Sequence, residues 1–302
     1  MKPVVAVISF LLVFLFSAAQ QKDKRLQRQV EELLREFHGD VGVYIKDLKS
    51  NRIVAVNQDT IFPTASIVKI PILVGVMHRI SKGGLNYHQE LHYHDSLLYP
   101  GVDILGSFRN GEKIELSKLI MLMMTMSDNT ASLWLQALAG SGLQINTLMD
   151  SLGFSATKVN SKTPGREHWR SQYGWGQSTP KEMVDLMQQI YEGKIISGAA
   201  SERMLRALNR NYWDAEAISQ IPPYASIFSK NGAVDRSRSE VVLVRGVKSL
   251  YVFCISTKNN ADTSWTENNE AWKLTRKLSN LLWNYFEPKH QWHPSPDAAR
   301  FR

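Results

Sequence analysis

Three short signatures lie in one order along this chain, and together they could build an acyl-transfer site. Ser66 is followed by Lys69, then come Ser-Asp-Asn at 127–129 and Lys-Asn-Gly at 230–232. A serine hydroxyl becomes an effective nucleophile only when a neighbouring group takes its proton. Residues three apart on a helix share one face, so this spacing brings the amine over the hydroxyl. One helical turn would therefore supply both the nucleophile Ser66 and its base Lys69, and histidine is not required.

The second signature offers groups that an amide substrate needs. The Ser127 hydroxyl can pass a proton to the leaving nitrogen, and Asn129 can hold a side-chain amide of the substrate, while Asp128 fixes the loop. The ordinary alternative is that these residues only cap a helix, since Ser, Asp and Asn favour that position.

The third signature predicts a substrate-binding strand beside the groove. Lys230 would bind a substrate carboxylate and lower the pKa of Lys69 by repulsion between like charges. The small Gly232 would let the substrate approach, and the N–H of Ala233 would complete an oxyanion hole with the N–H of Ser66. The alternative is a type I′ hairpin turn, because Asn-Gly is a strong signal for one.

Hydrophobic periodicity indicates the elements that position these residues. Apolar residues recur at helical spacing over 26–37, strand-like runs follow at 41–45 and 53–56, and helical patterns dominate from 64 to about 211. Two more strands, 240–245 and 249–257, precede a final amphipathic helix over 272–285. This order predicts an α+β fold, in which the chain returns to complete one antiparallel sheet and the terminal helices cover one face. The groove would lie between the sheet and the helical part.

The N-terminal segment is typical of a secretory signal. An apolar run from Val4 to Phe16 is followed by the small residues 17–19, and the run is too short to span a bilayer comfortably. We expect a signal peptide over 1–19 and export to the periplasm or beyond, without stable membrane insertion. The catalytic domain would cover 20–287, with an α/β part over about 20–63 and 215–287 and a helical part over about 64–214. A flexible tail would follow at 288–302.

Charge and composition limit the kinds of molecule that this protein is expected to bind. The 302 residues include 36 Lys and Arg against 28 Asp and Glu, a net charge of +8 that falls to +7 once Lys2 leaves with the signal. The basic residues are scattered, and no basic–aromatic module for nucleic acid is visible. We expect a monomer that acts on a small-molecule substrate.

Neither cysteine nor histidine indicates a cofactor. Cys254 is the only cysteine and lies in an apolar strand-like run, so we expect a buried core thiol. His88, His92 and His94 with Glu90 match no common zinc spacing. We expect neither a metal nor another cofactor.

Longer segments around the signatures carry a family resemblance. The second signature continues to Leu133, Leu148-Met149-Asp150-Ser151-Leu152-Gly153-Phe154 follows, and Thr179-Pro180-Lys181-Glu182-Met183 begins a helix with a capping box. The chain resembles the class A β-lactamases and the wider group of serine penicillin-recognising enzymes, from about Val41 to the final helix. The resemblance implies a five-stranded antiparallel sheet with terminal helices beside an all-helical subdomain.

The same resemblance implies a role for each site residue. Ser66 would be the nucleophile, Lys69 the base, Ser127 the proton shuttle and Asn129 the amide binder, with Lys230 as the carboxylate anchor. Tyr99 resembles the aromatic residue that forms the wall of the groove in this family.

Two departures from the family pattern qualify the expected activity. Class A enzymes carry a loop with Glu, two variable residues, Leu and Asn, whose Glu activates the deacylating water. Here the corresponding stretch offers only Glu167, without the Leu or the Asn, and Asn231 stands where the family usually has Thr or Ser. We therefore expect an exported serine hydrolase that opens β-lactams through an acyl-enzyme at Ser66, with Glu167 as a candidate deacylation base.

The alternatives are a D-Ala-peptide carboxypeptidase or esterase of the same fold, or a penicillin-binding protein that deacylates slowly. A sensing module that acylates once, or one that binds wall fragments without chemistry, is a further alternative. The presence of both Lys69 and Ser127 argues against the binder without chemistry, because binding alone needs neither residue.

Overall fold

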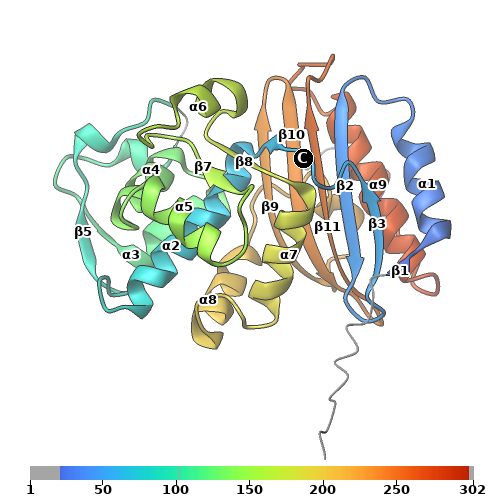
Figure 1. Cartoon of the computed structure of the whole chain (residues 1–302), viewed down its shortest axis with the longest axis horizontal. Coiled ribbons are helices and arrows are strands. Elements are labelled where there is room, and N and C mark those ends of the chain that lie inside the picture. Colours follow the sequence, from blue (N-terminus) through green and yellow to red (C-terminus); the bar gives the residue numbers. More distant parts are fainter. Residues whose placement is uncertain (1–20, 102, 299–302) are drawn as a thin grey trace, which may run out of the picture.

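The structure is a computed structural model that describes residues 21–101 and 103–298. In this part of the chain a six-stranded sheet has the order β1-β3-β2-β11-β10-β9. Its strands are β1 (Gln21–Lys22), β2 (Asp40–Asp47), β3 (Arg52–Val56), β9 (Ser226–Val234), β10 (Ser237–Arg245) and β11 (Leu250–Lys258). All neighbours are antiparallel except the short pair β1 and β3. The chain thus begins the sheet, leaves it, and returns to complete it, as Figure 1 shows.

Helices lie on both sides of this sheet (Figure 1). They are α1 (Lys24–Leu34), α2 (Lys69–Ser81), α3 (Leu116–Met121), α4 (Asn129–Leu138), α5 (Gly142–Ser151), α6 (Glu167–Tyr173), α7 (Pro180–Tyr191), α8 (Gly198–Leu208) and α9 (Glu270–Phe286). The terminal helices α1 and α9 cover the outer face, and α7 packs against β2 and β11 on the inner face. The expected α+β class, with terminal helices over one face, is confirmed.

Two hydrophobic cores follow from this layering. The strands that carry apolar side chains on both faces are buried throughout, as in Val241 to Val244 of β10 and Tyr251 to Ile255 of β11. Alternate side chains therefore enter opposite cores. Cys254 is fully buried among them and faces the core shared with the helical part, as the sequence predicts. Burial on both faces fixes the register of the strands, because a slip of one residue would exchange the two cores.

Helix α2 runs through the middle of the helical part. Every residue from Lys69 to Met77 is buried. Pro71 lies in its first turn, where the missing N–H costs little, and the chain leaves the helix through Gly83, which has a φ of +72°. The base predicted by the first signature therefore begins a helix that is buried from Lys69 to Met77.

The strand predicted from the third signature is confirmed, because the segment 226–234 forms the edge strand β9; its alternative, a type I′ turn at 231–232, is wrong, and the turn comes later, at 235–236. The structure differs from the sequence expectations in two places. The sheet gains β1 as a short parallel edge strand. The helical part is not all-helical, since β4 (Phe62–Pro63), β7 (Lys158–Val159) and β8 (Gly176–Ser178) form a small sheet, and β5 (Glu90–His92) pairs with β6 (Lys113–Glu115).

The flexibility expected of the tail stays a prediction, and its described part contacts α9. Trp292 packs against the core beneath α9, and its backbone N–H donates to Asn284 at 3.3 Å. The indole of Trp283 donates to the carbonyl of His290 at 2.8 Å. These contacts place His290 and Trp292 beside α9 and give the buried indole of Trp283 a polar partner for its N–H.

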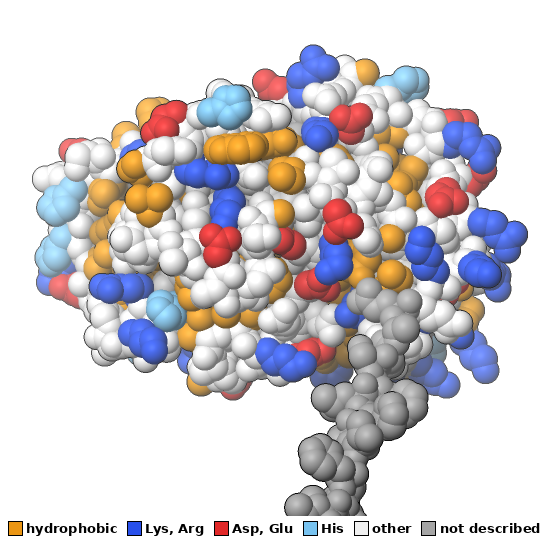
Figure 2. Space-filling view, in the orientation of Figure 1, with side chains coloured by type: hydrophobic (Ala, Val, Ile, Leu, Met, Phe, Trp, Pro, Cys, Tyr) orange, Lys and Arg blue, Asp and Glu red, His pale blue; other side chains and the backbone are white. Residues whose placement is uncertain are grey.

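The signal-like segment 1–19 lies outside the described residues. Within the described ones, none of the helices has both the length and the apolar character that crossing a membrane requires. On the face shown in Figure 2, Lys and Arg side chains are interspersed with Asp and Glu. This distribution agrees with the scattered charge seen in the sequence.

Candidate active site

Ser66 lies in a short 3₁₀ turn, Ala65–Val68, that leads directly into α2. The residue before it, Ala65, has a φ of +43°, a left-handed conformation that is unfavourable for a residue with a Cβ. Backbone outliers of this kind persist where surrounding contacts enforce them. Ser66 is half-buried and lines a cavity of about 510 Å³. The turn thus presents the hydroxyl to a cavity large enough for a small molecule.

Lys69 connects the first two signatures. Its ammonium nitrogen lies 3.2 Å from Oγ of Ser66 and 3.0 Å from Oγ of Ser127. It also donates to Oδ1 of Asn129 at 2.8 Å and to the carbonyl oxygen of Ser127. Lys69 has no exposed surface. One buried amine therefore contacts both hydroxyls that the predicted proton transfers require.

The surroundings of Lys69 favour its neutral form. Burial is the largest cause that lowers its pKa well below the ordinary lysine value, and the positive charge of Lys230 lowers it further. The carboxylates of Asp103 and Asp128 act in the opposite direction. Repulsion by Lys230 has the direction that the sequence predicts, but it is the second cause and desolvation is the first. A lysine with a lowered pKa can accept a proton near neutral pH.

Ser127 is positioned by an unusual helix end. Residues Leu122–Met126 form a π-helical turn, and Ser127 leaves it in the left-handed conformation, with a φ of +60°. Wide turns of this type often occur at functional sites. The buried Asp128 caps α4, accepting from the N–H of Ala131 at 2.8 Å and from that of Leu105 at 2.9 Å. Asp128 thus fixes the loop, as the sequence predicts.

Asp103 is a second carboxylate that holds this loop. Its Oδ2 accepts from the N–H of Asn129 at 3.0 Å and from the N–H of Thr130 at 2.9 Å. The first turn of a helix presents N–H groups without helical partners, so a carboxylate at this point is favourable. Asp103 therefore orients the backbone of Asn129 while the amide oxygen of Asn129 contacts Lys69.

Strand β9 lies against the nucleophile turn. A Cβ on Gly232 would lie only 2.5 Å from the carbonyl oxygen of Thr64 and 2.6 Å from the backbone nitrogen of Ser66. Only glycine allows the strand to come this close. Ala233 follows and lines the cavity. Because β9 is an edge strand, alternate backbone groups are free of a neighbouring strand, and donors near Ser66 could serve a developing oxyanion.

Lys230 is enclosed more completely than the sequence suggests. It has no exposed surface, and its ammonium donates to the carbonyl of Asn231 at 3.0 Å. Burial lowers its pKa to about 7, and the negative charge of Glu240 acts against this shift. Glu240 is itself buried on β10, opposite Asn231, and burial raises its pKa to about 8. Lys230 does not line the cavity that contains Ser66, so its role as the carboxylate anchor stays a prediction.

Of the remaining candidate residues Tyr99 and Asn231, only Tyr99 lines the cavity that contains Ser66. Tyr99 forms one end of the cavity, where its ring meets that of Trp175 edge to face at 4.9 Å. Asn231 is half-buried and its amide oxygen lies 3.4 Å from Nδ2 of Asn211, so its side chain contacts the segment that follows α8. Tyr99 thus has the wall position that the sequence predicts, while Asn231 does not line the cavity.

Glu167 is not among the residues that line the nucleophile cavity. It is the exposed first residue of α6, and its Oε1 accepts from the N–H of Gly165 at 3.1 Å. Among the described residues that line the cavity there is no Asp and no Glu. The same described part of the chain contains no group of three His, Cys, Asp or Glu residues suited to a metal ion. The role of Glu167 as a deacylation base stays a prediction.

Comparison with known proteins agrees with this geometry. A model of the Beta-lactamase enzyme family matches residues 25–286. The chain belongs to this family. It is similar to beta-lactamase VEB-1 from Pseudomonas aeruginosa, with 22% identity over 295 residues that cover 93% of this chain and 96% of the relative.

Solved structures share the fold of this family member. PBP-A superposes with a TM-score of 0.79 at 23% identity, covering 89% of this chain and 98% of PBP-A. A point mutant of PBP-A, solved as an acyl-enzyme complex with penicillin G, gives the same score and coverage at 24% identity. The extended-spectrum β-lactamase TLA-3 has a TM-score of 0.78 at 17% identity and covers 86% and 98% of the two chains. The expected class A β-lactamase resemblance and fold are confirmed.

The sequence did not indicate several residues of the site. Asp103 and Glu240 lie in segments without a recognisable motif, and only the folded chain brings them beside the three signatures. Arg236 and Lys258 line the far part of the cavity. The sequence offered a signal for Arg236, because a basic residue in the turn after the Lys-Asn-Gly strand would lie near the rim of the groove.

Proposed function

We propose that this protein is an exported serine hydrolase that forms an acyl-enzyme at Ser66 with β-lactams and related amides, and releases the acyl group slowly. One observation carries the first step: a single buried amine, that of Lys69, contacts the hydroxyls of both Ser66 and Ser127. Its pKa is lowered by burial, so the neutral form required of a base is accessible.

The acylation step follows from this arrangement. Neutral Lys69 takes the hydroxyl proton of Ser66 as Oγ attacks the carbonyl carbon of the substrate amide. Backbone N–H groups of Ser66 and Ala233 receive the developing oxyanion. Ser127 gives its hydroxyl proton to the leaving nitrogen and regains one from the ammonium of Lys69, so that the carbon–nitrogen bond breaks and an ester remains on Ser66.

The composition of the cavity supports slow release. Hydrolysis of the ester needs a water molecule and a base to activate it, and carboxylates are common bases for this purpose. No carboxylate lines the described part of the cavity, and Glu167 is exposed on α6. We therefore expect Glu167→Gln to leave the deacylation rate unchanged within about twofold. Loss of deacylation in that variant, measured as a longer-lived adduct, would restore Glu167 as the base.

Slow release favours one alternative named from the sequence. A penicillin-binding enzyme that acts on D-Ala peptides would use the same acylation chemistry, with β-lactams as long-lived inhibitors. Each candidate activity has support among the similar proteins. VEB-1 is named a β-lactamase, and the PBP-A mutant was solved as an acyl-enzyme complex with penicillin G. The lifetime of the adduct separates the two activities.

Mass spectrometry of the intact protein tests the proposal. The mature chain is incubated with penicillin G, and its mass is followed over hours beside that of Ser66→Ala. We expect a covalent adduct on the wild type that persists for many minutes, and none on the variant. An adduct of equal yield on Ser66→Ala would refute the nucleophile, and rapid return of free wild type with hydrolysed penicillin would indicate an efficient β-lactamase.

A further inference from the structure

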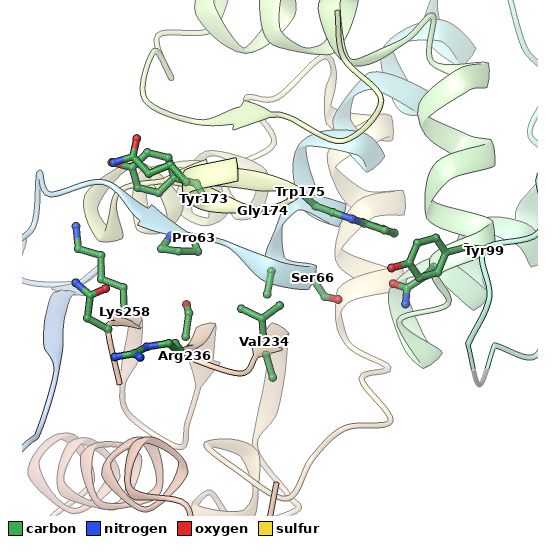
Figure 3. Close-up of a pocket in the computed structure, with 15 residues that line it drawn as sticks. Pro63, Ser66, Tyr99, Tyr173, Gly174, Trp175, Val234, Arg236 and Lys258 are labelled. Carbon is green, nitrogen blue, oxygen red and sulfur yellow. The ribbon is translucent and has the colours of Figure 1, made fainter. Parts of the chain in front are cut away.

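The cavity extends well beyond the nucleophile, toward a basic end. Figure 3 shows Ser66 near its middle, with Tyr99 on one side and the side chains of Arg236 and Lys258 on the other. Ser237 and Asn259 complete this end. The two cations therefore line the same cavity as the nucleophile, and the described lining residues include no acid to balance them.

Neither cation is neutralised by an ion pair. In the described part of the chain no carboxylate lies within 4 Å of Arg236 or Lys258. The ammonium of Lys258 donates to the carbonyl of Ile61 at 3.0 Å and lies 5.0 Å from the centre of the Phe62 ring. An ammonium has three N–H donors, so two remain for a ligand.

Two acids lie near the rim, and both have other partners. Asp235 accepts from the indole of Trp265 at 3.0 Å. Asp40 accepts from Nδ2 of Asn259 at 2.8 Å. Among the described residues neither carboxylate forms an ion pair with Arg236 or Lys258, so N–H donors of both cations remain open to a ligand in the cavity.

We propose that Arg236 and Lys258 form a subsite for a carboxylate on the acyl part of the substrate. The inference rests on the proposed acylation of Ser66 and names the substrate class: an acyl chain that ends in, or branches to, a carboxylate. A guanidinium and an ammonium facing one cavity without acids are suited to an anion of this kind.

The strand register sets the length of that acyl chain. Gly232, which lies against Ser66, is opposite Ser239, and Ser239 is opposite Ser256. Lys258 is two residues farther along. Two strand spacings and two residues give about 12 Å between the backbones at Gly232 and Lys258. The lysine side chain covers part of that distance. The carboxylate of the substrate would therefore lie about 8–10 Å from the reacting carbonyl, which is the length of about two to three extended residues.

Two matched penicillins test the subsite. The acid probe is 6-aminopenicillanic acid acylated with adipic acid, whose free carboxylate lies about 10 Å from the lactam carbonyl when extended. The neutral probe is its terminal carboxamide. We expect the wild type to be acylated faster by the acid probe, by about fivefold for each cation engaged, with the preference falling as salt is raised.

Three variants and one control assign the preference. Arg236→Gln and Lys258→Gln should each lose about fivefold of it, while acylation by the neutral probe stays unchanged. Lys258→Arg should retain the preference, because it keeps the charge. Lys273→Met, on the exposed side of α9, changes the net charge equally and should leave the preference unchanged.

The outcomes distinguish the two proposals. Equal acylation of the wild type by both probes would overturn the subsite and leave the acyl-enzyme proposal standing. A preference that survives the double variant of Arg236→Gln and Lys258→Gln would do the same. Failure of both probes to acylate the wild type would instead overturn the proposed function, and the subsite with it.

Discussion

Gly232→Ala tests whether the contact between β9 and the nucleophile turn is required for acylation. The added Cβ would lie 2.5 Å from the carbonyl oxygen of Thr64 and 2.6 Å from the nitrogen of Ser66. Ordinary contact begins near 3.4 Å, so the strand and the turn must separate by about 0.9 Å. Misplacement of reacting groups by about 1 Å can reduce a rate about 100-fold, and loss of one oxyanion donor costs about 100- to 1,000-fold.

We therefore expect Gly232→Ala to lower the second-order rate constant of acylation by at least about 100-fold. Crowding of this type also costs about 1–3 kcal/mol in the free energy of unfolding. The assay is stopped-flow labelling with a fluorescent penicillin, beside a thermal melt that shows how much of the protein is folded. A folded variant that labels at the wild-type rate would refute the argument that this strand completes the site.

Gly246→Ala is the matched control for this prediction. Its Cβ would meet Oε1 of Glu287 at 2.5 Å and Oγ of Ser249 at 2.6 Å, contacts of similar length but with side-chain ends in place of backbone atoms. Gly246 follows β10, seven residues or about 23 Å along the strand from Ser239, the partner of Gly232. The control should lose stability and keep its acylation rate, so a loss of rate in both variants would point to general destabilisation.

Two further predictions concern the buried charges behind the groove. The pKa of Lys230 is about 7, so the charged fraction of its amine falls from about 90% at pH 6 to about 10% at pH 8. The rate of acylation by a carboxylate-bearing penicillin should therefore fall about tenfold over that range. Lys230→Arg should abolish this alkaline decline, whereas an unchanged profile, or the same decline with a penicillin methyl ester, would assign it to another group. The raised pKa of Glu240, about 8, means that between pH 5 and 7 the folded state holds a proton that the unfolded state has released, so stability falls as pH rises. Glu240→Gln should remove a slope of roughly 1 kcal/mol per pH unit from denaturant unfolding, and an unaltered slope would contradict the assignment.

The parts of the site that depend on local geometry could be predicted from the sequence. The spacing of Ser66 and Lys69 fixes their relation within one helical turn, and the caps at Asp128 and Thr179 each bind the N–H group three residues ahead. The order of strands and helices predicted the sheet and the helices α1 and α9 that cover it.

Relations between distant residues could not be predicted in the same way. Asp103 binds the N–H of Asn129 across 26 residues, and no periodicity links the two. At 231–232 the local signal for a hairpin was wrong, because pairing with β10 and contact with the turn at Ser66 hold the segment extended. Tertiary packing overrides turn preference where a strand has both a neighbour and a core to face.

The same packing decides how Lys69 would act as the proposed base. Burial contributes most to its lowered pKa, so this property belongs to the closed helical part and not to any single charge. Binding of a substrate should change that balance in two directions. Expulsion of water from the cavity deepens the desolvation of Lys69, whereas a carboxylate beside Lys230 would neutralise the neighbouring cation and relieve its repulsion. Because the two effects change the pKa of Lys69 in opposite directions, each offsets part of the other while the groove fills.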